Sequence, residues 1–154
     1  MLPALRRLPL AVAVLLSALL GACGDTSGAV HINSAGTSVA LTSAQLTELP
    51  TATLTYKDHR YTGVRLRDVL AHANIAADQN ITAVGADDYS KVLTPATLQR
   101  DDAILAYAVD DGLLRADEGP LRIVVADAPG LSVKRLVRLS VGGEAPAAAG
   151  TAAH

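Results

Sequence analysis

The chain has 154 residues, a formal net charge of −2 at pH 7, and four tyrosines but no Phe or Trp. Without a long basic stretch it lacks the positive surface that phosphate backbones attract, so no nucleic-acid partner is expected. The few aromatic rings also exclude a base-stacking platform. Cys23 is the single cysteine, so no intramolecular disulfide can form.

Residues 1–22 have the three parts of a secretory signal peptide. Arg6 and Arg7 supply the positive charge, an uncharged run rich in Leu, Val and Ala follows over 8–22, and small residues close it. The run is shorter than the roughly 20 apolar residues that an ordinary membrane-spanning helix needs. We therefore expect residues 1–22 to be removed during export. The arginine pair leaves a twin-arginine export route open as an alternative.

The tetrapeptide LGAC at 20–23 resembles the bacterial lipobox, in which small residues precede a cysteine that becomes acylated. This resemblance implies a lipid on Cys23, attachment to a membrane, and a cell-envelope location facing the periplasm or the exterior. Several acyl chains would make that attachment firm. The alternative is an ordinary signal peptide in which the cysteine is incidental. Residues 23–28 are otherwise small and polar, which predicts a lipidated tether.

Residues 29–141 alternate short strand patterns with short helix patterns and predict one α+β domain with a mixed β-sheet. A first helix can begin at Thr42 or Ser43 and end by Leu49, and a second is predicted over 64–73. Pro95 opens a third. Asp110-Asp111-Gly112 predicts a tight turn. Residues 142–154 are Ala-, Gly- and Pro-rich and predict a disordered tail. Six to eight strands are expected, at 29–33, 38–41, 52–56, 81–85, 90–93, 103–109, 121–126 and 133–141.

Five segments carry a family resemblance because of their order along the chain. They are YTGVRLRDVL (61–70), ADDYS (86–90), AILAY with DGLL (103–107 and 111–114), GPLRIVV (119–125) and KRLVRL (134–139). Together they resemble the oxidoreductase molybdopterin-binding domain of the sulfite oxidase type. The resemblance implies a mixed-sheet fold that holds a pterin-bound molybdenum and performs two-electron chemistry.

The resemblance also implies an anion site. Arg122 matches the arginine of the family's "P-x-R" element, Lys134 matches its lysine near the pterin phosphate, and Ser132 stands in the matching loop. Arginine forks and lysine ammonium groups are the usual holders of anions in proteins. The alternative is that Arg122 and Lys134 are solvent-facing strand residues.

His59 and Arg60 belong to the polar segment 56–60, at the place of the family's cofactor loop. The segment predicts either the rim of a cleft, with His59 titrating beside Asp58, or only a polar hairpin turn. In the family, the cysteine that binds molybdenum lies in this stretch, and 53–60 contains none. Because lipid would occupy Cys23, no soft thiolate ligand would remain for the metal.

No metal site and no catalytic residue are predicted from the remaining polar residues. The histidines lack zinc-ligand spacing. The acidic pairs lack the alternating spacing of a calcium loop and fall where turns are expected. These pairs are Asp87-Asp88, Asp101-Asp102 and Asp110-Asp111.

These observations predict a lipid-anchored envelope protein whose domain binds a small anionic ligand or a protein partner, without catalysis and without a cofactor. The alternative is a molybdopterin-dependent oxidoreductase, or a subunit of one, that holds the cofactor without a cysteine ligand. Whether the protein is an enzyme stays open at this point.

Overall fold

A computed structural model describes residues 28–142. The predicted signal peptide, Cys23 and the tether up to residue 27 lie outside the described residues, as does the predicted tail from 143 onward. Within the described range, no helix combines the length and the apolar character that crossing a membrane requires.

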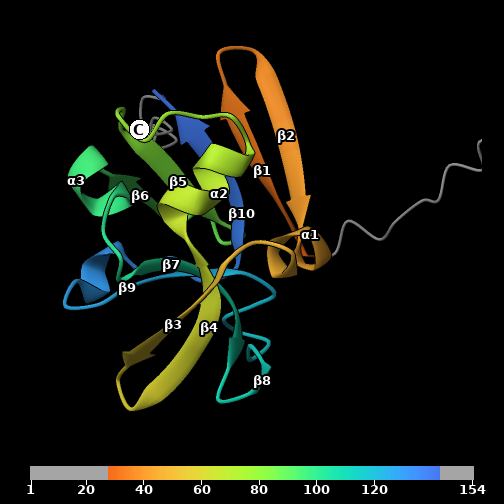
Figure 1. Cartoon of the computed structure of the whole chain (residues 1–154), viewed down its shortest axis with the longest axis vertical. Coiled ribbons are helices and arrows are strands. Elements are labelled where there is room, and N and C mark those ends of the chain that lie inside the picture. Colours follow the sequence, from red (N-terminus) through yellow and green to blue (C-terminus); the bar gives the residue numbers. More distant parts are fainter. Residues whose placement is uncertain (1–27, 143–154) are drawn as a thin grey trace, which may run out of the picture.

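Ten strands within residues 28–142 form two sheets (Figure 1). The first has the order β2 (Thr37–Thr42), β1 (Ala29–Ser34), β10 (Leu136–Val141), β5 (Ile81–Gly85) and β6 (Ser90–Leu93). The second has the order β3 (Thr51–Tyr56), β4 (His59–Arg65), β7 (Ala103–Val109) and β8 (Gly112–Leu113), and β9 (Arg122–Val125) also pairs with β7. The helices are α1 (Ser43–Thr47), α2 (Leu66–His72), α3 (Pro95–Leu98) and the 3₁₀ turn η1 (Pro129–Leu131). The first sheet combines the parallel pair of β1 and β10 with antiparallel pairs, and the pairs of the second sheet are antiparallel. Together with the few short helices, these sheets confirm the predicted α+β class.

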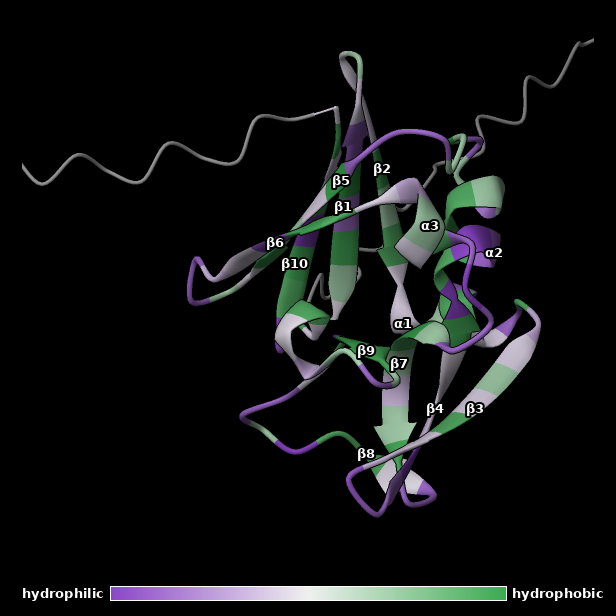
Figure 2. Cartoon of the chain, turned by 90° about the vertical axis from the view of Figure 1, so that its left-hand side faces the viewer, coloured by the Kyte–Doolittle hydropathy of each residue, from purple (hydrophilic) through white to green (hydrophobic). Residues whose placement is uncertain are grey.

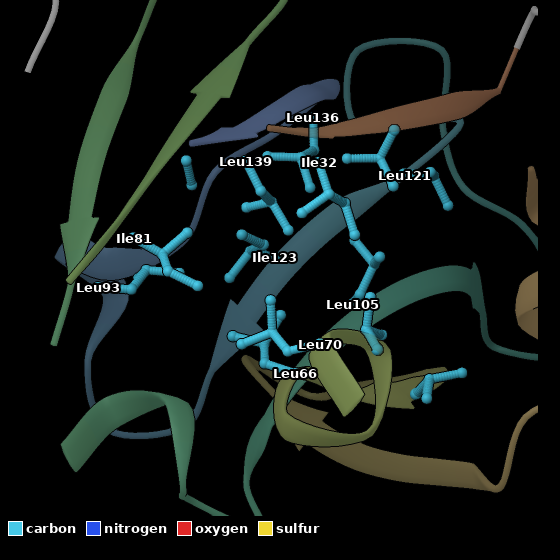
Figure 3. Close-up of a cluster of buried hydrophobic side chains, with 14 of the residues drawn as sticks. Ile32, Leu66, Leu70, Ile81, Leu93, Leu105, Leu121, Ile123, Leu136 and Leu139 are labelled. Carbon is cyan, nitrogen blue, oxygen red and sulfur yellow. The ribbon is translucent and has the colours of Figure 1, made fainter. Parts of the chain in front are cut away.

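The main hydrophobic core joins the two sheets and α2. Figure 3 shows Leu66 and Leu70 of α2 pointing toward side chains of both sheets, among them Ile123. Figure 2 colours the chain by hydropathy: strands such as β9 are hydrophobic, and many of the loops are hydrophilic.

The second sheet is covered on both faces, and this positions the site described below. Side chains alternate along a strand, so Leu105 of β7 packs in the main core while Ile104 and Ala106 belong to a smaller cluster on the opposite face. Tyr61 of β4 and Val124 of β9 also belong to that cluster.

Local sequence signals determine the turns and caps. Thr42, one of the two predicted caps, begins α1 in a capping box with Gln45, and Pro95 begins α3 as predicted. The β3–β4 hairpin turns through Lys57 and Asp58 at φ 49° and 65°, the two positive values that favoured two-residue hairpins require.

Two strands were missed, and two predicted starts were wrong. Strand β4 was not predicted, because the segment 56–60 was interpreted as a polar turn, and β8 was missed as well. The helix predicted from Val64 begins at Leu66, since Val64 and Arg65 still pair with β7. The strand predicted from Val133 begins at Leu136: Val133 makes an isolated bridge to Ile123, and Arg135 has a positive φ of 48°.

Gly63 marks the tightest contact between β4 and β7. A Cβ at this position would lie 2.1 Å from the Leu105 carbonyl oxygen and 2.6 Å from the Ala106 Cα. We expect Gly63→Ala to lower the free energy of unfolding by about 1–3 kcal/mol or more, because backbone atoms would have to move. Denaturant unfolding measures the loss. Gly130→Ala is the control, since its Cβ would meet no atom within 4 Å, and equal stability of the two variants would contradict the β4–β7 register.

Candidate functional site

A cavity of about 250 Å³ opens on the face of the second sheet that carries the smaller hydrophobic cluster. We call it the cationic cavity, because four cationic side chains and one carboxylate line it. They come from the β3–β4 hairpin, the β8–β9 loop, the first residue of β9 and the loop before β10. The lining residues are Tyr56, Lys57, His59, Tyr61, Arg115, Glu118, Arg122 and Lys134.

Arg122 lies at the centre of this arrangement and is buried, with 7% of its side chain exposed. Its Nη1 donates hydrogen bonds to Glu118 Oε1 and, over 2.8 Å, to the Tyr61 hydroxyl. The guanidinium also lies 5.1 Å and 5.8 Å from the ring centroids of Tyr61 and Tyr56, within the range of cation–π attraction. A buried arginine held on several sides is a rigid positive charge.

The alternative prediction, a solvent-facing Arg122, was wrong. Strand alternation does direct Arg122 away from the main core, on the same face as Val124. The β8–β9 loop, however, covers that face and brings Glu118 over the guanidinium, and the Glu118 side chain is only 8% exposed.

Polar atoms remain without partners around this pair. Arg122 Nε, Glu118 Oε2 and Ser132 Oγ are buried and have no hydrogen-bond partner within residues 28–142. Each such atom costs about 1–3 kcal/mol if nothing satisfies it. A bound polar molecule in the cavity would offset the cost for Arg122. Ser132 is not among the residues that line the cavity.

Lys134 reaches the cavity from a different part of the chain. The isolated bridge between Val133 and Ile123 holds its loop against β9, and the Arg135 backbone N–H donates to the Glu118 carbonyl at 2.8 Å. The Lys134 ammonium donates to Asp117 over 3.0 Å and lies 3.8 Å from Glu118 Oε1. Its hydrogen bond lowers the pKa of Asp117 below the ordinary value. Lys134 remains half exposed.

His59 lines the cavity, but its partner is not the predicted Asp58. Its Nδ1 lies 2.6 Å from Asp110 Oδ2, and its Nε2 lies 3.4 Å from Arg115 Nη2. The Arg60 backbone N–H, and then His59, hold the pKa of Asp110 below its ordinary value. Asp58 sits instead in the hairpin turn.

Arg60 is not part of the cavity lining. Its guanidinium pairs with Asp111 in the β7–β8 turn, where both side chains are more than half exposed. The structure thus brings together Arg122, Lys134 and His59 and leaves Arg60 and Ser132 outside the lining.

Tyr61, Arg115 and Glu118 were not identified as site residues from the sequence. Tyr61 lies two residues after His59, so a predicted β4 would have placed both on one face. Burial raises the pKa of the Tyr61 phenol above its ordinary value, although Arg122 opposes this shift. Arg115 and Glu118 lie in a loop with no strand or helix pattern, and no sequence signal identifies them.

The donor set of the cavity fits an anion. Arginine, lysine and tyrosine side chains donate hydrogen bonds to oxygen atoms, and none of them supplies a thiolate. Within residues 28–142, no group of three or more His, Cys, Asp or Glu side chains could hold a metal ion. The described residues therefore suit the phosphate of a molybdopterin and provide no soft ligand for its molybdenum.

We expect Arg122→Met to lower the free energy of unfolding by about 3–5 kcal/mol, because the Glu118 carboxylate would remain buried without its partner. The double variant Arg122→Met with Glu118→Leu should recover most of that loss, since both charges are then removed. Arg60→Met is the control at an exposed ion pair and should cost much less. Denaturant unfolding of the unsubstituted protein and the three variants measures these losses. A double variant less stable than Arg122→Met alone would contradict the pairing of Arg122 with Glu118.

Two comparisons with known proteins bear on this site. The sequence model of the family described as the oxidoreductase molybdopterin-binding domain matches residues 27–149. A search of curated proteins found no match. The matched range covers every strand and helix that the structure describes and all the residues of the cationic cavity. The chain belongs to the oxidoreductase molybdopterin-binding domain family.

Proposed function

We propose that this protein is a lipoprotein of the cell envelope, anchored through Cys23, whose domain binds a small anion in the cationic cavity. The observation that carries the proposal is the convergence of a buried arginine, Arg122, with the half-exposed Lys134 in one cavity. The proposed ligand class is an oxyanion, such as inorganic phosphate or a phosphorylated small molecule.

The charge balance supports a modest preference for anions. Lys57, Arg115, Arg122 and Lys134 line the cavity against Glu118 alone. Two further carboxylates lie at its edge, where Asp117 contacts Lys134 and Asp110 contacts His59. Glu118 neutralises much of the Arg122 charge, so Lys134 and Arg115 would supply most of the attraction to a ligand.

The volume of the cavity supports a small ligand. About 250 Å³ is below the roughly 300–1,000 Å³ of cavities that enclose drug-sized ligands. If a molybdopterin did bind, its phosphate would contact these same cationic side chains, and the cofactor would supply the redox chemistry. The alternative function, an oxidoreductase that holds the cofactor without a cysteine ligand, therefore shares the anion site and differs in its metal content.

We expect inorganic phosphate and pyrophosphate to raise the melting temperature of the purified protein more than sodium chloride does at equal ionic strength, because a ligand that binds the native state stabilises it. Lys134→Ala and Arg115→Ala should each abolish most of this shift. Lys91→Ala is the matched control, since Lys91 lies on β6 beside Tyr89 and away from the cavity. An undiminished shift in both cavity variants would exclude the site.

Metal analysis of the same preparation separates the two functions. The proposed binding protein should contain far less than one molybdenum per chain. Stoichiometric molybdenum, together with a fluorescent pterin product after oxidation, would contradict the non-catalytic function and establish the alternative.

The anchor at Cys23 has its own test. We expect the mature protein, extracted from membranes with detergent, to begin at Cys23 and to exceed its polypeptide mass by the mass of the lipid. Cys23→Ala should release the protein from the membrane fraction, because its acyl chains supply the attachment. A mature N-terminus at another residue, with an unmodified polypeptide mass, would refute the lipoprotein assignment.

A further inference from the structure

A second hollow, of about 470 Å³, lies between α1 and the chain around β8. Apolar side chains dominate its walls, among them Leu113, Leu114, Ala116 and Pro120. Leu113 stands out because 89% of it is exposed. An exposed leucine that adjoins an apolar groove forms with it one continuous apolar surface, which another apolar phase can cover. We call this hollow, together with the residues that line it, the apolar groove.

The chain enters the described domain at the rim of this groove. The Gly28 carbonyl accepts hydrogen bonds from the Ser43 hydroxyl at 3.1 Å and from the Ser43 backbone N–H at 3.2 Å. A Cβ on Gly28 would lie 3.5 Å from Pro120. Ser43 and Pro120 both line the groove, and β1 accordingly begins beside α1 (Figure 1).

The spacing between Cys23 and Gly28 limits how far this rim can lie from the proposed anchor. Five residues span at most about 18 Å when fully extended. A lipid on Cys23 would therefore keep this rim of the apolar groove within about 18 Å of the bilayer surface. At the opposite end of the domain, the Gly142 N–H donates to the Asn80 carbonyl beside β5, so the C-terminal end of the described chain leaves far from the groove (Figure 1).

We propose that the apolar groove is a membrane-docking surface and that Leu113 inserts into the bilayer that holds the Cys23 lipid. The inference rests on the proposed lipid anchor and adds an orientation of the domain. Arg115 supports this orientation, because it lines both the groove and the cationic cavity and can attract anionic headgroups. Docking by the groove would hold the cationic cavity close to the membrane surface.

The experiment uses the full-length, lipidated protein. Because lipid occupies Cys23, a Leu113→Cys variant carries one free thiol, which can be labelled with an environment-sensitive fluorophore. The exposed position tolerates this substitution. Val92→Cys is the matched control on β6, with Val92 41% exposed and outside the groove. Both labelled proteins are reconstituted into vesicles of phosphatidylcholine and phosphatidylglycerol that contain a spin-labelled lipid.

We expect emission from position 113 to shift to the blue and to be quenched by the spin-labelled lipid at least twofold more than emission from position 92. Equal quenching at the two positions would overturn the docking proposal. A label at position 113 that is shielded from water in native membranes but not in pure lipid vesicles would also overturn the proposal, in favour of a protein partner.

The two proposals fail in distinguishable ways. The intact mass of the reconstituted protein shows whether Cys23 carries lipid, independently of the fluorescence. An unmodified mass refutes the anchor and, with it, the docking that depends on the anchor. A lipidated protein whose position 113 stays in water refutes the docking alone.

Discussion

Arg122 and Glu118 are both removed from water, and burying two charges costs more than their attraction returns unless other groups satisfy them. The Tyr61 hydroxyl and the faces of two tyrosine rings supply part of that compensation. The pair fastens the β8–β9 loop onto the second sheet, and this loop carries Arg115 and Pro120. Both the cationic cavity and the apolar groove include residues of the loop. One ion pair therefore shapes two surfaces with different chemistry.

Much of the fold follows from local signals. Apolar runs identified strands such as β5 and β7, and Thr42 and Pro95 identified helix starts. The errors arose where pairing with another strand overrode the local pattern. His59 and Arg60 look like turn residues, yet they pair with β3, and Val64 extends a strand because it pairs with β7. No local pattern contains that information.

The site was predictable only in part, for the same reason. Motif matching pointed to Arg122 and Lys134, which do line one cavity, but the burial of Arg122 depends on a loop whose conformation the sequence does not reveal. His59 found its partner in Asp110, far along the chain, instead of in the adjacent Asp58. The family membership and the donor set of the cationic cavity are both compatible with the phosphate of a molybdopterin, and residues 28–142 contain no thiolate.

The parallel pairing of β1 with β10 has a consequence for the proposed export of the chain. His31 pairs with Arg138, so the first strand of the domain lies between β2 and the last strand. Contacts between the two ends of a chain form late, because a long loop must close first. A chain that crosses a membrane N-terminus first would carry an incomplete first sheet until its last strand had emerged. The edge of β1 that later pairs with β10 would meanwhile be open to incorrect pairing, while the hairpin with β2 would cover only the other edge.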